Sequence, residues 1–422
     1  MRPEGAAVMT DKPSVSLFRI LPLYIIIFVA FFGYSLMITI LTPMIMEDSG
    51  GIMGSLPFEA ERPIVLGVLL ALYPLGQFFG SPVLGAMSDK FGRRPVLLVS
   101  LGVIAACYGL FAFSIEIRNL PLLMAVSLVA GLADSDIATA QSAIADLSTE
   151  ETRGRLFGYI YLSASSAFIA GPLIGGRLAD PSLVRWFSYS TPYEAVFILL
   201  IGAFVFSFLV FRETHPPRRR RHISYSDAFT HIFSIFTAGR IRFFYLVNFL
   251  IYFSIFGFFR AYPLYLVDVF GMGVERVSLF VAWVAVPIAL ANLGLTGFVS
   301  GYFSTRTVTL YSTAVCGLFM FAVILPESEG ALWVTLFLPG LALAVALPAC
   351  SSMLLLSAGT SEEGRVLGNN QSLQVGAEAL SGFGAGLLAA VFFKLPLIVF
   401  SAVAILAALL LAAEGRGRER KE

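Results

Sequence analysis

Twelve long apolar runs constrain this chain more than any other feature of its sequence. A helix needs about 20 residues to cross the roughly 30 Å of hydrocarbon in a bilayer, and each run approaches or exceeds that length. The runs lie at residues 18–46, 64–87, 95–115, 120–145, 155–177, 190–211, 243–267, 275–302, 307–325, 331–354, 365–393 and 396–413. They predict an all-α integral membrane protein with twelve transmembrane helices.

The composition favours a membrane protein over a soluble one. Hydrophobic residues fill 58% of the 422 positions and charged residues 13%, about half of the ~25% that soluble proteins carry. Cys107, Cys316 and Cys350 all lie inside apolar runs, so no disulfide framework is expected. We find no nucleophile–base pair, phosphate-binding loop or signalling domain, which argues against an enzyme or a receptor.

Basic residues in the loops predict the orientation of the helices. The stretch between runs six and seven carries Arg212 and Arg218–Arg221, whereas residues 47–61 contain four acids and no base. Under the positive-inside rule the middle loop and both termini are cytoplasmic, and we expect a bacterial inner membrane. Orientation and anionic lipid explain the basic stretch, so no nucleic-acid partner is expected.

The two halves of the chain echo each other. "EETRGRLFG" at 150–158 returns as "TSEEGRVLG" at 360–368, and "GAMSDKFGRR" at 85–94 returns in degraded form as "GFVSGYFSTR" at 297–306. We therefore expect two pseudo-symmetric six-helix bundles with a site between them near the middle of the membrane. The predicted parts are residues 1–211, a cytoplasmic basic linker at 212–242, and residues 243–422 with a short basic tail.

The loop between runs two and three has a recognisable pattern. "GAMSDKFGRRP" matches the signature G-x-x-x-D-x-x-G-R-R/K at Gly85, Asp89, Gly92, Arg93 and Arg94. With its flanking helices it resembles the major facilitator superfamily, especially the drug/proton antiporters of the tetracycline-efflux type. The resemblance covers essentially the whole chain and implies a transporter that works by alternating access.

The same loop is a candidate cytoplasmic gate. We expect Asp89 to cap the start of run eleven near Gly364, because a helix N-terminus favours an anion. Gly85 would allow close helix approach, and Gly92 a tight turn. The two arginines could pair with acids that close run four or open run five: Asp146, Glu150 and Glu151. The alternative is a solvated turn that only obeys the positive-inside rule.

Run five carries a second pattern, in "GYIYLSASSAFIAGPLIGGRL". It is similar to the antiporter signature G-x8-G-x3-G-P-x2-G-G, with Ala167 replacing one glycine. The matching residues are Gly158, Gly171, Pro172, Gly175 and Gly176. Small residues allow close helix packing and proline a bend, and the resemblance implies export. The alternative is generic small-residue packing.

Two positions depart from the resemblance. The family often has an arginine in helix four where this chain has Ser127, and tetracycline-type antiporters have an aspartate in helix one where this chain has Ala30. Both usual proton-handling residues are therefore missing. These departures argue against tetracycline as the substrate and against the usual coupling site.

Run four contains two acids near its middle. An acid in the bilayer interior is costly and is a functional candidate by default. In a continuous helix, Asp134 lies on one stripe with Ser127 and Gln141, seven residues away on either side. We expect Asp134 to take part in proton coupling or cation binding, and Asp136 to be a structural partner of a neighbouring helix.

Runs seven and eleven add further polar candidates. Arg260 could snorkel to the surface or form a plain ion pair; alternatively it could bind an anionic substrate group or pair with Asp134. Glu378 shares a face with Gln371 and Gln374, as part of either a wet lining or an interhelical network. Tyrosines such as Tyr34 could contact substrate, although aromatic residues at this density mostly pack.

The residues and the resemblance favour a proton-coupled transporter that exports a small amphipathic or organic-ion compound. The alternative is a proton symporter that imports an anionic metabolite or a metal chelate, with Arg260 as its anion clamp. The expected partners are a small-molecule substrate, protons and the lipid bilayer. We expect a monomer without a cofactor or a bound metal.

Overall fold

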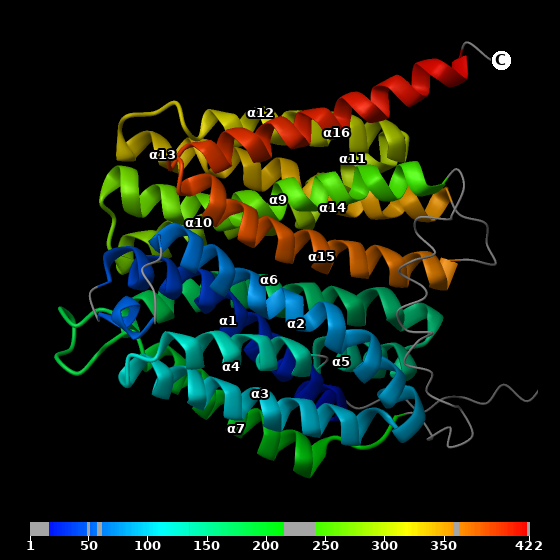
Figure 1. The fold of residues 1–422 in the computed structure, drawn as a ribbon. Helices are drawn as coiled ribbons and strands as arrows, with labels where there is room; N and C mark the ends of the chain where they lie inside the picture. The colour runs from blue at the N-terminus through cyan, green and yellow to red at the C-terminus, as the bar shows by residue number, and fades with distance from the viewer. Residues whose placement is uncertain are drawn as a thin grey trace, which may run out of the picture.

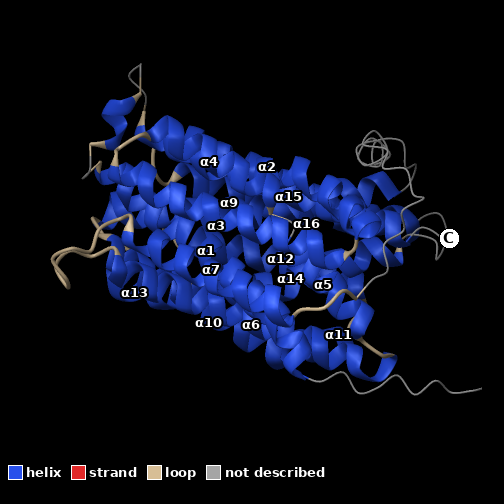
Figure 2. Ribbon diagram, turned by 90° about the horizontal axis from the view of Figure 1, so that it is seen from below, coloured by secondary structure: helices blue, strands red, loops and turns tan. Residues whose placement is uncertain are grey.

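Long helices that run alongside one another make up the computed structural model (Figure 1). It describes residues 17–48, 51–56, 61–134, 136–214, 241–357 and 363–419. These segments contain helices, turns and loops, and no strand (Figure 2). The prediction of an all-helical fold is therefore confirmed.

Each predicted apolar run coincides with one helix or with a helix in successive pieces. The first half contains α1 (Leu17–Glu47), η1 (Ile52–Ser55), α2 (Arg62–Phe91), α3 (Arg93–Glu116), α4 (Leu120–Ala133), α5 (Asp136–Leu147), α6 (Glu150–Leu178) and α7 (Thr191–Val210). The second half contains α9 (Ile241–Phe270), α10 (Val274–Leu290), the π-helical turn η2 (Ala291–Leu295), α11 (Thr296–Tyr302), α12 (Thr305–Ala322), α13 (Glu329–Thr335), α14 (Phe337–Leu356), α15 (Glu363–Ala389) and α16 (Leu395–Glu419).

Ten helical segments of the described chain are long and apolar enough to cross a membrane. The segments α12 and α15 are not among them. Polar residues lie at 304–307 around the start of α12, and α15 carries a polar stretch at 369–374. The number of twelve membrane crossings and the orientation of the termini therefore stay predictions.

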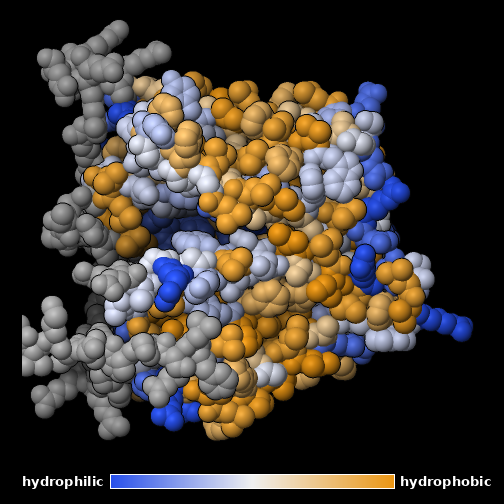
Figure 3. Space-filling view, turned by 180° about the vertical axis from the view of Figure 1, so that it is seen from behind, coloured by the Kyte–Doolittle hydropathy of each residue, from blue (hydrophilic) through white to orange (hydrophobic). Residues whose placement is uncertain are grey.

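Two large buried apolar clusters form most of the interior, beside a small one of Val308, Val345 and Ala349. One is built from residues 20–211 together with Leu264 and Ala389, and the other from residues 244–411. Large apolar side chains also cover the outer surface, among them Leu209 at 74% exposure and Leu293 at 83%. Figure 3 shows this apolar band across the middle of the molecule, with hydrophilic residues toward its ends. Such a surface suits a hydrocarbon environment.

The two halves press together most closely near one end, which we call the Glu61 end because α2 begins there. A Cβ atom on Gly67 of α2 would lie 2.8 Å from the backbone of Gly386 in α15. On the other side of the interface, a Cβ on Gly176 of α6 would collide with Ser278 of α10. The absence of side chains at these glycines lets the helices touch.

The opposite end, where α2 ends at the Gly92 turn, is more open. Among the described residues, a Cβ on Gly85, Gly158 or Gly368 would meet nothing within 4 Å. Figure 3 shows a hollow lined by hydrophilic residues on this side of the molecule. The expected close approach of a helix at Gly85 finds no neighbour among the described residues and stays a prediction.

Candidate functional site

The centre of the interface holds an ion pair between helices of the second half. Nη2 of Arg260 in α9 lies 2.9 Å from Oε1 of Glu378 in α15. The same Nη2 donates a hydrogen bond to the Tyr34 hydroxyl of α1 at 3.1 Å, and that hydroxyl donates to Oε1 of Glu378. Residues far apart in the sequence thus form one cluster that bridges the two halves.

Burial makes the cluster electrostatically strong. Arg260 is 2% exposed and Glu378 is 8% exposed, so their charges compensate each other away from bulk water. Gly382 provides the space, because a Cβ there would come within 3.1 Å of Cδ and Nε of Arg260. Removing either side chain would therefore leave the other charge buried without its partner.

Aromatic rings surround the hydroxyl of the cluster. The Tyr34 ring lies 5.6 Å from that of Tyr73 in α2 and 6.5 Å from that of Phe168 in α6, and Phe168 lies 5.5 Å from Phe31. All four rings belong to the first half. They give this side of the interface an apolar, polarisable wall beside a carboxylate.

This geometry answers two of the alternatives for Arg260 and leaves the binding of an anionic substrate group open. Its ion pair is with Glu378, so the suggested pairing with Asp134 is wrong. Snorkelling is wrong as well, because the side chain is buried and held at the interface. Sequence spacing could not bring Arg260, Glu378 and Tyr34 together, since the contacts join three different helices.

Asp134 lies at an interruption that the sequence analysis missed. The helix α4 stops at Ala133, and α5 starts at Asp136. The shared stripe of Ser127, Asp134 and Gln141 assumed an unbroken helix and is therefore wrong. Asp134 itself is 5% exposed and accepts a hydrogen bond from Nε2 of Gln77 in α2 at 3.1 Å. The side chain of Asp136 lies outside the described set.

Glycines explain how α2 reaches this acid. A Cβ on Gly76 or Gly80 would collide with the backbone of α4, and a Cβ on Gly131 would collide with the backbone of α2. The two helices therefore touch backbone to backbone just before the interruption. This contact places Gln77 beside Asp134.

The polar side chains of α15 lie in different environments. Asn370 is buried and accepts from Nδ2 of Asn248 at 3.1 Å, while its own Nδ2 donates to the Tyr252 hydroxyl at 2.9 Å. Gln371 is exposed and Gln374 is partly exposed. One part of this stretch thus forms an interhelical network with α9, whereas the two glutamines, on the face of Glu378, stay candidates for a wet lining. An asparagine inside apolar run seven was the missed signal for Asn248.

The Gly92 turn is held by contacts within the first half. Nη1 of Arg93 lies 2.9 Å from Oδ1 of Asp89, and Nε of Arg93 lies 3.3 Å from Oδ2 of Asp146. The second pair is one of those suggested from the sequence. Gly92 has φ of 100°, a conformation that favours glycine. The guanidinium of Arg94 donates to the carbonyl of Phe208.

A residue that the sequence analysis missed caps this turn. The carboxylate of Glu213, just after α7, accepts hydrogen bonds from the backbone N–H groups of Arg93 at 2.8 Å and Arg94 at 3.0 Å. It thus pairs N–H groups that the first turn of α3 leaves without a partner in the helix, and a helix N-terminus favours an anion. The suggested contact of Asp89 with the start of α15 involves side chains near Gly364, which lie outside the described set, as do those of Glu150 and Glu151. That gate stays a prediction.

The glycine pattern of run five lies in α6 and is used for packing. A Cβ on Gly171 would collide with Ser35 of α1, and one on Gly175 with Leu36. Pro172 lies inside the same helix. These residues bring α6 against α1, and Gly176 brings it against α10. Gly158 has no such neighbour among the described residues.

The described part of the chain offers no group of three or more His, Cys, Asp and Glu side chains that could hold a metal ion. The site is therefore described by one ion pair, one further buried acid, aromatic rings and amides. This set can bind protons and organic ions.

Comparisons with known proteins identify the family of this chain. A model of the Major Facilitator Superfamily matches residues 23–372. The chain is 30% identical over 364 residues to the tetracycline resistance protein, class E, of Escherichia coli, covering 83% of this chain and 82% of that protein.

Solved structures agree on the fold. The crystal structure of a D-xylose–proton symporter is similar, with a TM-score of 0.74 and 14% identity over 93% of this chain and 97% of that one. The crystal structure of the human organic anion transporter MFSD10 is similar, with a TM-score of 0.66 and 20% identity over 93% of this chain and 99% of that one. At these identities the likeness concerns the fold alone.

Proposed function

Because the chain belongs to the major facilitator superfamily, and is therefore a multi-pass membrane transporter and not an enzyme, we propose that it exports a small amphipathic organic ion in exchange for protons. One observation carries the proposal. The buried Arg260–Glu378 pair lies at the interface of the two halves and is bonded there by Tyr34. An intramembrane carboxylate in such a position is a functional residue by default.

Glu378 would couple proton binding to the movement of the halves. Ionised, it holds Arg260 and accepts the hydrogen bond of Tyr34 from the other half. A proton on Glu378 removes its negative charge and weakens both contacts. The contact between the halves at this level would thus depend on protonation, as coupling by alternating access requires.

The substrate would bind beside the same cluster. The rings of Phe31, Tyr34, Tyr73 and Phe168 offer an apolar wall, and aromatic faces attract organic cations. A cationic group would compete with the proton for the Glu378 carboxylate. Such competition favours exchange over cotransport.

The orientation follows from the basic loops. We propose twelve membrane crossings in two bundles, at residues 1–211 and 243–422, with the linker at 212–242 and both termini in the cytoplasm of a bacterium. The Gly92 end then faces the cytoplasm, and the hollow between the halves is open to it. A substrate would enter from this side, and the gate residues around Asp89 and Arg93 would close behind it.

Asp134 is a second proposed site for a proton or a cation. Transporters place coupling ions where a membrane helix is interrupted and carbonyl groups are freed. Asp134 lies at such an interruption, between α4 and α5, and is bonded by Gln77. Gln141 lies in α5, seven residues after Asp134, and is only partly buried; we propose that it lines the same route.

One observation supports a second candidate function. Nε of Arg260 is buried without a hydrogen-bond partner among the described residues. If a proton neutralised Glu378, the guanidinium could bind an anionic substrate group, and proton and anion would travel together. This is the alternative of a proton symporter that imports an anionic metabolite or a chelate.

A proton-flux measurement separates the two. Inside-out vesicles from cells with and without the protein are acidified by ATP hydrolysis, and tetracycline, ethidium or salicylate is added in turn. Exchange predicts that at least one compound lowers the acidification only when the protein is present. Uptake of the compound into whole cells that requires an inward proton gradient would overturn the export proposal and support symport.

A further inference from the structure

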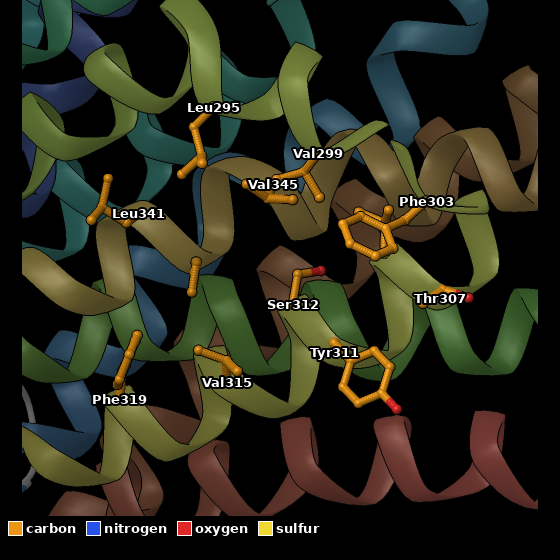
Figure 4. A pocket seen from close by; sticks show the side chains of 12 residues that line it. Leu295, Val299, Phe303, Thr307, Tyr311, Ser312, Val315, Phe319, Leu341 and Val345 are labelled. Atoms are coloured by element: carbon orange, nitrogen blue, oxygen red, sulfur yellow. The ribbon is translucent and has the colours of Figure 1, made fainter. Parts of the chain in front are cut away.

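A long apolar groove lies on the outer face of the second half (Figure 4). It runs between α12, α14 and the segment formed by η2 and α11, and has a volume of about 440 Å³. Its helix α12 packs against α14 and α16. The groove is thus separate from the interface that holds Arg260 and Glu378.

One face of α12 forms the floor along its length. Thr307, Tyr311, Val315 and Phe319 follow one another at steps of four residues, so they lie on one side of the helix. Twelve residues at 1.5 Å each span about 18 Å, slightly more than half of the roughly 30 Å hydrocarbon core. The groove therefore begins at the Gly92 end of α12 and reaches about one leaflet deep.

The surface of the lining is apolar along this whole depth. The lining residues that carry hydroxyl groups, Thr307, Tyr311 and Ser312, lie in the part nearest the helix end. The Thr307 hydroxyl is hydrogen-bonded to that of Ser304, and the Ser312 hydroxyl donates to the carbonyl of Thr309, so the surface that they present to the groove is apolar. The deeper part is lined by apolar side chains such as Phe319 and Leu341. Figure 4 shows Thr307 and Tyr311 toward one end of the groove and Phe319 and Leu341 toward the other. The acyl chain of a phospholipid is apolar over the same depth of the membrane.

The wall formed by α11 has few packing contacts, among them that of Val299 with the small cluster of Val308, Val345 and Ala349. This helix has no buried residue. A Cβ on Gly294, Gly297 or Gly301 would meet nothing within 4 Å among the described residues. Protein interiors are close-packed, so a ligand in the groove would supply contacts that this wall otherwise lacks.

We propose that the groove binds one acyl chain of a phospholipid from the leaflet at the Gly92 end, aligned along α12. A bound lipid has its ester groups near Thr307 and its chain end near Phe319. The lining includes no charged side chain, which disfavours the organic-ion substrate as the occupant. The inference does not depend on the direction or the substrate of transport.

Photo-crosslinking tests the site directly. The full-length protein in nanodiscs of phosphatidylethanolamine and phosphatidylglycerol receives trace phosphatidylglycerol with a diazirine either near the carbonyl or at the end of one acyl chain. After irradiation, adducts are mapped by peptide mass spectrometry. The expected adducts are near Thr307 and Tyr311 for the first probe, and near Phe319 and Leu341 for the second.

Variants on one helix provide the control. Ser312→Phe fills the groove and should abolish these adducts, and Leu341→Trp provides a second filling variant. Leu318→Phe, on the outward face of α12 at 59% exposure, should leave them unchanged. Equal labelling of all lipid-facing helices, unchanged in the filled variants, would overturn the proposal. So would a reversed order of the two probes, or displacement of the adduct by a transported compound.

Discussion

The guanidinium of Arg260 and the carboxylate of Glu378 meet at 2.9 Å although 118 residues separate them. The pair belongs to the second half, but its hydrogen bonds to Tyr34 cross to the first half. A change in the charge of Glu378 therefore acts on the contact between the halves.

Gly386→Ala should disfavour the conformation described here. A Cβ at this position would come within 2.7 Å of Gly67, and relieving such overpacking costs about 1–3 kcal/mol. The halves should separate at the Glu61 end, and single-molecule energy transfer between labels on Ser182→Cys and Glu327→Cys should report a longer distance. The control Gly384→Ala has only an ordinary contact at 3.8 Å and should leave the distance unchanged.

Tyr34→Phe should shift the same equilibrium by a smaller amount. The change keeps the ring but removes the hydrogen bonds to Arg260 and Glu378, each worth about 0.5–1.5 kcal/mol. The same labelled pair should show a larger share of molecules opened at the Glu61 end. Tyr262→Phe is the matched control, because its buried hydroxyl has no hydrogen-bond partner among the described residues. Equal shifts in both variants would contradict the bridging role of Tyr34.

Arg260→Met should destabilise the protein by about 3–5 kcal/mol, because it leaves the Glu378 carboxylate buried without its partner. The double variant Arg260→Met, Glu378→Leu should recover most of that loss, since neither charge then remains. Thermal unfolding in detergent measures both changes. If the double variant unfolds as early as the single one, charge compensation is not what stabilises this cluster.

Glu213→Ala should lower the free energy of unfolding by about 0.5–2 kcal/mol, the usual effect of losing an N-terminal cap. Its carboxylate accepts from two backbone N–H groups at the start of α3. As a comparison, Glu329→Ala removes an exposed ion pair with Arg276, and such pairs contribute about 0–1 kcal/mol. Chemical denaturation of both variants provides the test, and a larger loss for Glu329→Ala would argue against the cap.

Hydropathy was sufficient to predict the helices, because an apolar run of membrane length has few alternatives to a helix. The Gly92 turn and the close packing of the glycine-rich face of α6 were also predictable, because glycine allows a tight turn and a close approach of helices. In contrast, the interruption at Asp134 has no proline or glycine of its own at residues 134–136. It depends on tertiary contacts with α2.

The central cluster was only partly predictable. Arg260 and Glu378 stood out as charges in apolar runs, but their pairing depends on how α9 and α15 rotate about their axes. The role of Tyr34 depends in addition on how the two halves dock, which the spacing of residues along one helix does not determine. Glu213 was missed because it lies at the start of the basic linker, where a lone acid carries no distinctive pattern.

The most direct test of the account is active transport by Glu378→Gln in proteoliposomes, alongside Asp134→Asn. With a compound that the wild type transports, Glu378→Gln should still exchange labelled for unlabelled compound across the membrane at a saturating concentration, because the aromatic wall remains although the cation loses its carboxylate partner. It should no longer accumulate the compound when a proton gradient is imposed. Accumulation at the wild-type level by Glu378→Gln, with loss of accumulation only in Asp134→Asn, would contradict the central claim and move proton coupling to Asp134.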